Sequence, residues 1–188
     1  LAEAFDPEEF FTQLGKDLPC AVQLRAKQAR GMPAVLGALK DACQARQIPF
    51  YVNDHRDWLM PGVDGIHLGQ DDGDVGLLQG IQVGRSTHTL KQVRDAASDA
   101  RVDCLGWGPI RSTSSKRHAD EPVGLSSCRQ AVANASGKPI IAIGGLGVDD
   151  FATLKHSGVW AAAVISAVWR APEPVEALRT LIHRWRDA

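Results

Sequence analysis

Residues 20–27 read CAVQLRAK, an apolar run that passes into three long polar side chains at every second position. In an extended strand alternate side chains point to the same face, so Gln23, Arg25 and Lys27 are expected on one side of it. One amide and two cations cannot form a core there, because an unpaired buried charge is costly. This segment therefore predicts a strand whose carboxyl end meets an anionic, hydrogen-bonding ligand.

The same pattern, an apolar strand followed by polar residues or glycine, recurs along the chain. Strands are expected at about residues 20–26, 48–53, 65–69, 81–86, 102–107, 139–143 and 161–166. Helical patterns are expected at residues 5–18, 32–46, 90–99, 125–135, 148–156 and 174–185, with a turn or two at 75–79. Helices that alternate with nearly continuous apolar strands are typical of an α/β fold with a parallel sheet.

Two parallel-sheet folds fit this alternation. An open, doubly wound sheet would want a G-x-G-x-x-G turn after its first strand, and the chain contains no such motif. We therefore expect a (β/α)8 TIM barrel that forms a single domain over residues 1–188. The predicted strands are one short of eight, and the chain begins on a helix. We expect the first strand to lie upstream of Leu1, between the strands at 20–26 and 161–166.

Composition excludes several classes of function. Hydrophobic residues make up 44% and charged residues 23% of the 188 residues, and the formal net charge is −1. These values are ordinary for a globular protein and give no sign of a nucleic-acid or membrane partner. We expect neither a transmembrane segment, since no apolar stretch is long enough, nor a signal peptide. The four cysteines lie far apart, which favours reduced thiols in a cytoplasmic protein over structural zinc.

In a βα barrel the carboxyl ends of all strands meet at one rim, which is the catalytic face. Asp54 and Asp72 follow neighbouring strands and are expected there. Two facing carboxylates repel unless positive charge lies between them, and hard oxygen ligands suit Mg²⁺. The alternative is a pair of solvated loop carboxylates, or an N-cap at Asp72.

Other segments of the rim could bind phosphate. The loop from Ser112 to Lys116 offers hydroxyls, backbone N–H groups and one ammonium, although a plain surface loop would have the same composition. Gly144 and Gly145, and the start of the helix after Ser166, end the last two strands, where barrels often bind phosphate through backbone N–H groups.

Together these segments resemble the thiamine phosphate synthase family. The resemblance covers roughly residues 20 to 168, and although each motif is weak by itself, their order is specific. The matching segments are QLRAK at 23–27, VND at 52–54, GIHLGQDD at 65–72, GRSTHT at 84–89, GWGPI at 106–110, TSSK at 113–116, AIGG at 142–145 and VISA at 164–167.

The resemblance implies a transferase of thiamine biosynthesis. Such an enzyme joins 4-amino-2-methyl-5-(diphosphomethyl)pyrimidine to a thiazole-ethyl phosphate and releases pyrophosphate. Its partners would be these two phosphorylated small molecules, with self-association into a homo-oligomer left open, and its cofactor Mg²⁺.

The resemblance also assigns roles to residues. The pyrimidine would contact Gln23, and Mg²⁺ would bind Asp54 and Asp72. The diphosphate would be held by Arg25, Lys27, Asn53, Ser86 and Lys116, and all of these except Asn53 are the expected catalytic residues. The thiazole phosphate would be held by Thr113, Ser115, Gly145, Ile165 and Ser166.

This chain departs from the family pattern in two places besides the first strand. At Arg111 and Ser112 the family more often has an aromatic residue followed by proline, and residues 73–82 are short for the usual intervening helix. Both departures affect the expected geometry of loops.

Two other functions remain. A thiazole tautomerase, an isomerase on a related barrel, would have no diphosphate to neutralise, so Asp54, Asp72 and Lys116 together favour the synthase. A non-catalytic sensor of phosphorylated ligands is the third alternative.

Overall fold

The computed structural model of the chain describes residues 6–15, 19–26, 32–74, 76, 78–112 and 120–188. Within these residues, strands pair in parallel in chain order and form one sheet. The strands are β1 (Val22–Leu24), β2 (Phe50–Asn53), β3 (Gly65–Leu68), β4 (Gln82–Thr87), β5 (Cys104–Trp107), β6 (Ile140–Ile143) and β7 (Ala161–Ala163). This α/β order confirms the expected parallel sheet.

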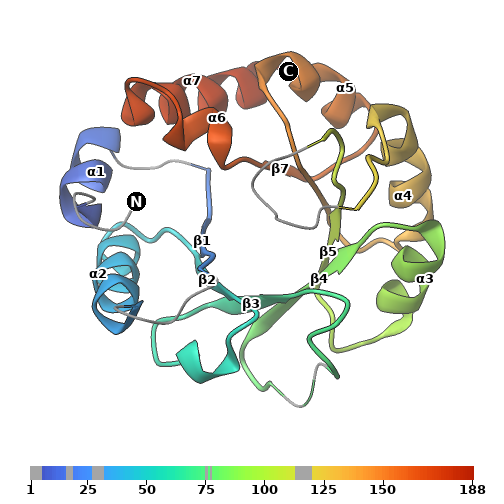
Figure 1. Cartoon of the computed structure of the whole chain (residues 1–188), viewed down its shortest axis with the longest axis horizontal. Helices are drawn as coiled ribbons and strands as arrows, with labels where there is room; N and C mark the ends of the chain where they lie inside the picture. Colours follow the sequence, from blue (N-terminus) through green and yellow to red (C-terminus); the bar gives the residue numbers. More distant parts are fainter. Residues whose placement is uncertain (1–5, 16–18, 27–31, 75, 77, 113–119) are drawn as a thin grey trace.

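Helices surround the strands on the outside (Figure 1). They are α1 (Pro7–Leu14), α2 (Met32–Gln44), α3 (Leu90–Ser98), α4 (Cys128–Asn134), α5 (Phe151–His156), α6 (Ser166–Trp169) and α7 (Pro174–Asp187). Three short 3₁₀ helices are η1 (Arg56–Trp58), η2 (Leu125–Ser127) and η3 (Val148–Asp150). None of the helices in the described part of the chain is long and apolar enough to cross a lipid bilayer.

Local chemistry accounts for the start and the end of α1. The Asp6 carboxylate accepts hydrogen bonds from the backbone N–H groups of Glu8 and Glu9, at 2.9 and 3.2 Å, and so caps the first turn. Pro7 occupies the first helical position, where its missing N–H costs nothing. The helix ends at Gly15, whose φ of 99° is readily adopted only by glycine.

The two faces of the sheet differ in chemistry. Side chains that point toward the helices, among them Val52, Ile66 and Leu105, are completely buried and form the hydrophobic core. The opposite face carries polar and small residues such as Asn53, Gly84 and Ser86. Because side chains alternate along each strand, a core on one face leaves the other free for a polar interior.

Some predicted boundaries are wrong. The strand expected to reach residue 166 ends at Ala163, and Ser166 instead begins α6. The helix expected to reach residue 46 ends at Gln44, and Gln47 then takes a left-handed φ of 56°. In the expected turn at 75–79, Gly76, Leu78 and Gln79 are not helical, and the other two residues lie outside the described part.

The sheet is open at two edges. Among the described residues β1 pairs with β2 alone, and β7 with β6 alone. The strands thus form a curved, barrel-like sheet of the TIM type, and their carboxyl ends gather on one side of the molecule. That side is the expected catalytic face.

Candidate active site at the carboxyl ends of the strands

The structure places the predicted site residues that it describes at or just beyond the carboxyl ends of six strands. They are Gln23 and Arg25 at β1, Asn53 and Asp54 at β2, Asp72 after β3, Ser86 near the end of β4, Gly145 after β6, and Ile165 and Ser166 after β7. The predicted residues Lys27, Thr113, Ser115 and Lys116 lie outside the described residues.

Asp54 is held at the end of β2 by its backbone and by its neighbour. Its φ of 63° lies in the left-handed region, which is uncommon for a residue other than glycine. Its backbone N–H donates to the His67 carbonyl at 2.9 Å. Asn53 Nδ2 donates to Asp54 Oδ1 at 2.7 Å and to the same His67 carbonyl at 3.0 Å. The strained turn thereby fixes the Asp54 carboxylate on the rim.

Asp72 faces Asp54 from the segment that follows β3. Its Oδ2 accepts a hydrogen bond from Gly69 N at 2.5 Å. Partial burial of the Asp54 carboxyl group, a hydrogen bond shared with Asp72 and the charge of Asp72 raise the pKa of Asp54 to about 6, and Arg25 opposes this shift. The two carboxyl groups therefore lie within hydrogen-bonding distance, and the charge of Asp72 disfavours the ionised form of Asp54.

The chemistry of this pair fits a hard divalent cation. A cation between the two carboxylates would remove their repulsion. In the described part of the chain, no three Cys, His, Asp or Glu side chains cluster in a way that could hold a metal. Such a cation would accordingly have two protein carboxylates and complete its shell with water or phosphate, as Mg²⁺ commonly does.

His67 and Ser86 form a second contact on the polar face of the sheet. His67 Nε2 lies 2.9 Å from Ser86 Oγ, and burial lowers the pKa of His67 to about 4, so the ring is neutral at pH 7. This histidine has a hydrogen-bond partner within the protein. It also holds Ser86, a role that sequence reasoning missed.

Glycines on the neighbouring strands make room for this histidine. A Cβ atom at Gly84 would lie 2.5 Å from His67 Nδ1, and one at Gly106 would lie 3.0 Å from His67 Cε1. Gly84 is the register partner of His67, and Gly106 is that of Ser86. Glycines on the same face of two adjacent strands were the available sequence signal for an enclosed ring.

The two-glycine turn after β6 packs against the segment that follows β5. Gly144 and Gly145 have φ values of 102° and 65°. A Cβ atom at Gly145 would lie 2.9 Å from Arg111 Cβ, while Arg111 N donates to the Gly144 carbonyl at 3.0 Å. The glycines are thus required by backbone conformation and close approach, whether or not the turn also binds phosphate.

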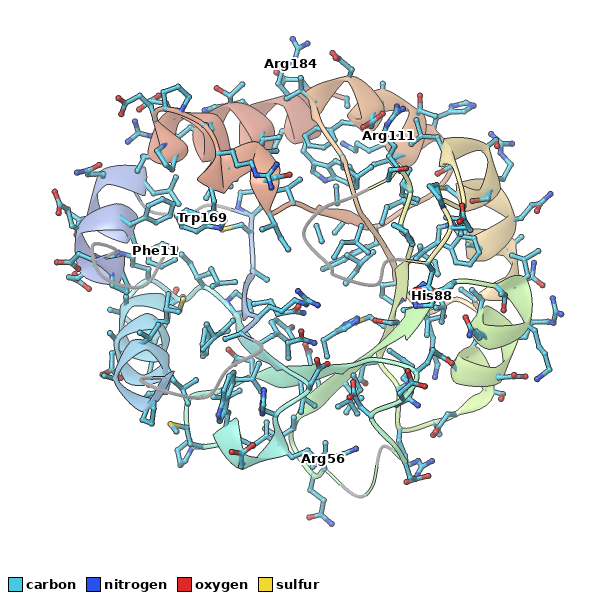
Figure 2. All side chains as sticks on the ribbon, viewed as in Figure 1. Phe11, Arg56, His88, Arg111, Trp169 and Arg184 are labelled. Atoms are coloured by element: carbon cyan, nitrogen blue, oxygen red, sulfur yellow. The ribbon has the colours of Figure 1, made fainter. Side chains whose placement is uncertain are left out.

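Arg111 ties these two segments together (Figure 2). Its Nη2 lies 2.5 Å from Asp150 Oδ1, and Asp150 is only 5% exposed. The other carboxylate oxygen of Asp150 accepts from Gly147 N at 3.0 Å. The sequence showed that Arg111 departs from the family pattern but gave no indication of this partner.

His88, also labelled in Figure 2, reaches the same side of the sheet. Its Nδ1 donates to the Gly108 carbonyl at 2.5 Å, and its Nε2 lies 3.3 Å from Asp120 Oδ2. His88 therefore links the end of β4 to Gly108 and Asp120, which both belong to the connection after β5. These contacts give it a structural role within the rim.

A protein-family comparison matches the same part of the chain. The model described as thiamine monophosphate synthase matches residues 8–168. The chain belongs to the thiamine monophosphate synthase family. It is 40% identical over 162 residues to thiamine-phosphate synthase of Anaeromyxobacter dehalogenans, which covers 82% of this chain and 72% of that protein.

Other members of the thiamine monophosphate synthase family differ in length. Thiamine-phosphate synthase of Neisseria meningitidis serogroup A is 31% identical over 172 residues, with 83% of it covered. Thiamine-phosphate synthase of Synechococcus sp. CC9311 is 38% identical over 169 residues, but the chain spans only 47% of its length.

Solved structures support the family fold. Thiamine phosphate pyrophosphorylase from Pyrococcus furiosus superposes with a TM-score of 0.80 at 26% identity, with 97% of this chain and 91% of that chain covered. Orotidine 5'-phosphate decarboxylase from Pyrococcus horikoshii superposes with a TM-score of 0.72 at 12% identity, a likeness of fold alone.

Proposed function

We propose that this chain is a thiamine phosphate synthase. It would transfer the pyrimidine-methyl group of 4-amino-2-methyl-5-(diphosphomethyl)pyrimidine to the nitrogen of a thiazole-ethyl phosphate, giving thiamine phosphate and pyrophosphate. Family membership and the names of the relatives support this reaction. The observation that carries it in the structure is the contact between Asp54 and Asp72 on the rim, near Arg25.

The proposed reaction breaks one C–O bond and forms one C–N bond. The diphosphate leaves with the electron pair of the C–O bond, and the electron-rich aminopyrimidine carries the positive charge left on the methylene carbon. The thiazole nitrogen then donates its lone pair to that carbon. Fixed positive charge near the leaving oxygen lowers the barrier, because it stabilises charge that develops as the bond breaks.

Separate groups of residues in this chain would bind the two substrates. Arg25, at the end of β1, would contact the diphosphate, together with Asn53 and the Ser86 hydroxyl. Lys27 and Lys116 are proposed for the same group from the family resemblance. Mg²⁺ bound at Asp54 and Asp72 would supply further positive charge to the diphosphate.

The thiazole phosphate would bind on the β6 and β7 side of the rim. Gly145 would offer its backbone N–H to the anion, and Ile165 and Ser166 bring backbone N–H groups to the start of α6. Thr113 and Ser115 are proposed there from the family resemblance. In this division Gln23, the residue proposed to contact the pyrimidine, would lie across the two unpaired edges of the sheet from the thiazole phosphate, so that the protein would orient one ring toward the other.

We further propose that the sheet belongs to a complete (β/α)8 barrel. A further strand would pair with β1 on one side and with β7 on the other. The two unpaired parallel edges and the superposition on the Pyrococcus furiosus structure support this closure. The free cysteines suit the reducing cytoplasm, which is the proposed location.

The two alternatives predict different products. A thiazole tautomerase would isomerise a thiazole phosphate and release no pyrophosphate, and a sensor would bind ligands without turnover. Contact between two carboxylates beside an arginine has a clear use only for a bound cation and a polyanion, which favours the synthase.

The test is a turnover assay with both substrates. Purified protein is supplied with the pyrimidine diphosphate, the thiazole phosphate and Mg²⁺, and pyrophosphate and thiamine phosphate are measured together. We expect both products in equal amounts, and their loss with a chelator and in Asp72→Asn. Isomerised thiazole without pyrophosphate would establish the tautomerase, and tight binding without any product would establish the sensor.

A further inference from the structure

The segment that carries Asp72 is not part of a helix or a strand and is held by residues from other elements. Residues 69–74 connect β3 to the rest of the chain without a helix, and Asp72 closes only a short turn with Gly69. A segment of this kind loses substantial conformational entropy when it is ordered. Something outside the segment must therefore hold it where it stands.

Arg85 holds the segment on both sides of Asp72. Arg85 alternates with Gly84 and Ser86 along β4, so its side chain leaves the face of the strand opposite to the Ser86 hydroxyl. Its Nη1 donates to the Gly73 carbonyl at 3.0 Å and its Nη2 to the Gln70 carbonyl at 3.3 Å. The two nitrogens of one planar guanidinium thus bracket Asp72 through the backbone.

Arg56 supports the same segment from η1. It extends toward the connection between β3 and β4 (Figure 2) and donates through Nη2 to the carbonyls of Asp72, at 3.4 Å, and Asp74. Four backbone carbonyls of this segment, those of Gln70, Asp72, Gly73 and Asp74, therefore accept hydrogen bonds from two arginines.

Arg101 fixes the far end of the segment. It binds both carboxylate oxygens of Asp74, at 2.7 and 3.2 Å, and is itself held by Asp99 at 2.8 Å. This ion pair is exposed, and such pairs contribute little to stability.

We propose that Arg85, supported by Arg56, is a positioning residue for the cation bound by Asp54 and Asp72. This inference rests on the proposed function. A hard cation requires ligand oxygens in a narrow range of positions, so its affinity depends on how firmly the Asp72 carboxylate is held against Asp54. Arg85 touches neither substrate nor cation and acts through the backbone on either side of Asp72.

The geometry also explains why arginine is needed. The planar fork of Arg85 reaches the Gln70 and Gly73 carbonyls with two separate nitrogens, whereas a lysine would have to reach both from one nitrogen on a flexible stem. Arg85→Lys should therefore retain one contact and part of the effect. Arg85→Met keeps much of the length of the side chain but has no donor.

Mn²⁺ serves as the probe, because it binds carboxylate oxygens as Mg²⁺ does and its free form is measured directly by electron paramagnetic resonance. Titrations use the full chain without substrate. We expect Arg85→Met to weaken Mn²⁺ binding by about 10-fold to 100-fold, as is typical when support for a metal ligand is lost. Arg85→Lys and Arg56→Met should fall between this variant and the unmodified protein.

The matched control is Arg94→Met. Arg94 lies on α3, is exposed and donates to Asn134 Oδ1 at 3.1 Å, far from the 69–74 segment in the hydrogen-bond network. Arg94→Met should bind Mn²⁺ like the unmodified protein.

The turnover assay gives a second measurement. Arg85→Met should need a higher Mg²⁺ concentration for half activity, and its kcat should largely recover when Mg²⁺ saturates. A purely structural defect would lower kcat at every Mg²⁺ concentration.

The outcomes separate this inference from the proposed function. If Arg85→Met and Arg56→Met bind Mn²⁺ as tightly as the unmodified protein while Asp72→Asn does not, the metal site stands and the positioning role is overturned. If Asp54→Asn and Asp72→Asn also leave Mn²⁺ binding unchanged, the metal site itself is wrong and the inference falls with it. Should Arg85→Met fail to fold, Arg85→Lys and Arg56→Met provide the same comparison.

Discussion

Asp54 illustrates how a single residue couples the site to stability. Its pKa in the folded chain is about 6, above the ordinary value of 3.8, because of partial burial and the contact with Asp72. Between these two values the folded protein binds more protons than the unfolded protein. The stabilisation from this group is thus fully present below the unfolded pKa and is lost as pH rises through about 6.

This titration can be measured in metal-free protein. With a chelator present, we expect the unmodified protein to lose stability relative to Asp54→Asn as pH rises from 3.8 to about 6. Urea unfolding of both proteins at several pH values gives the difference. If the two stability profiles stay parallel across this range, the pKa of Asp54 is not raised in the folded protein.

A second prediction at the scale of a residue concerns Gly84, whose substitution tests how tightly His67 is packed. An added methyl group would lie 2.5 Å from His67 Nδ1 and 3.2 Å from Cys104 Sγ. We expect Gly84→Ala to lower the free energy of unfolding by about 1–3 kcal/mol, because buried overpacking has this cost.

The control is Gly37→Ala on α2, where a Cβ atom would meet nothing within 4 Å. That change should stabilise the protein by roughly 0.5–1 kcal/mol, since alanine favours helices. Equal effects in the two variants would contradict the packing argument.

At the scale of elements, a contact joins the segments after β5 and β6 on the side of the rim that is proposed to bind the thiazole phosphate. Arg111 joins them through Asp150 and through the Gly144 carbonyl. Given the proposed function, Arg111→Phe, which restores the aromatic residue common in the family, should raise the KM for the thiazole phosphate severalfold. The KM for the pyrimidine diphosphate should change little, because that substrate is assigned to the β1–β4 side.

Steady-state kinetics with each substrate varied in turn will show this difference. Asp150→Asn removes the partner charge and should reproduce the effect, and the double variant should be no worse than either single one, as expected for two members of one contact. A matching rise in both KM values would mean that the link supports the whole rim and not one substrate.

At the scale of the whole molecule, the site depends on strands that are distant in sequence. Arg25 comes from β1, and its charge reaches both Asp54 and His67 on neighbouring strands. Arg25→Met should lower kcat/KM for the pyrimidine diphosphate by roughly 10- to 100-fold, because a charge-assisted hydrogen bond contributes about 1.5–3 kcal/mol. Calorimetric binding of the thiazole phosphate alone should be unaffected. If only thiazole binding is lost, the tautomerase becomes the better assignment.

The sequence by itself determined the order of strands and helices, the polar rim and the family. These features depend on local periodicity: alternation within a strand assigned Gln23 and Arg25 to one face, and the helical pattern at residues 5–18 indicated α1. Boundaries were less accurate, as at β7, because a strand ends where its neighbour stops pairing, and this is not encoded locally.

Only the tertiary structure decided which side chains meet. The contact of Asp54 with Asp72, the space that Gly84 and Gly106 leave for His67, and the hold of Arg85 on residues 69–74 each join separate elements. Such contacts depend on strand register and on the direction in which each side chain leaves its strand. Both are set when the sheet assembles and its core packs, since a shift of one residue would move every side chain to the other face.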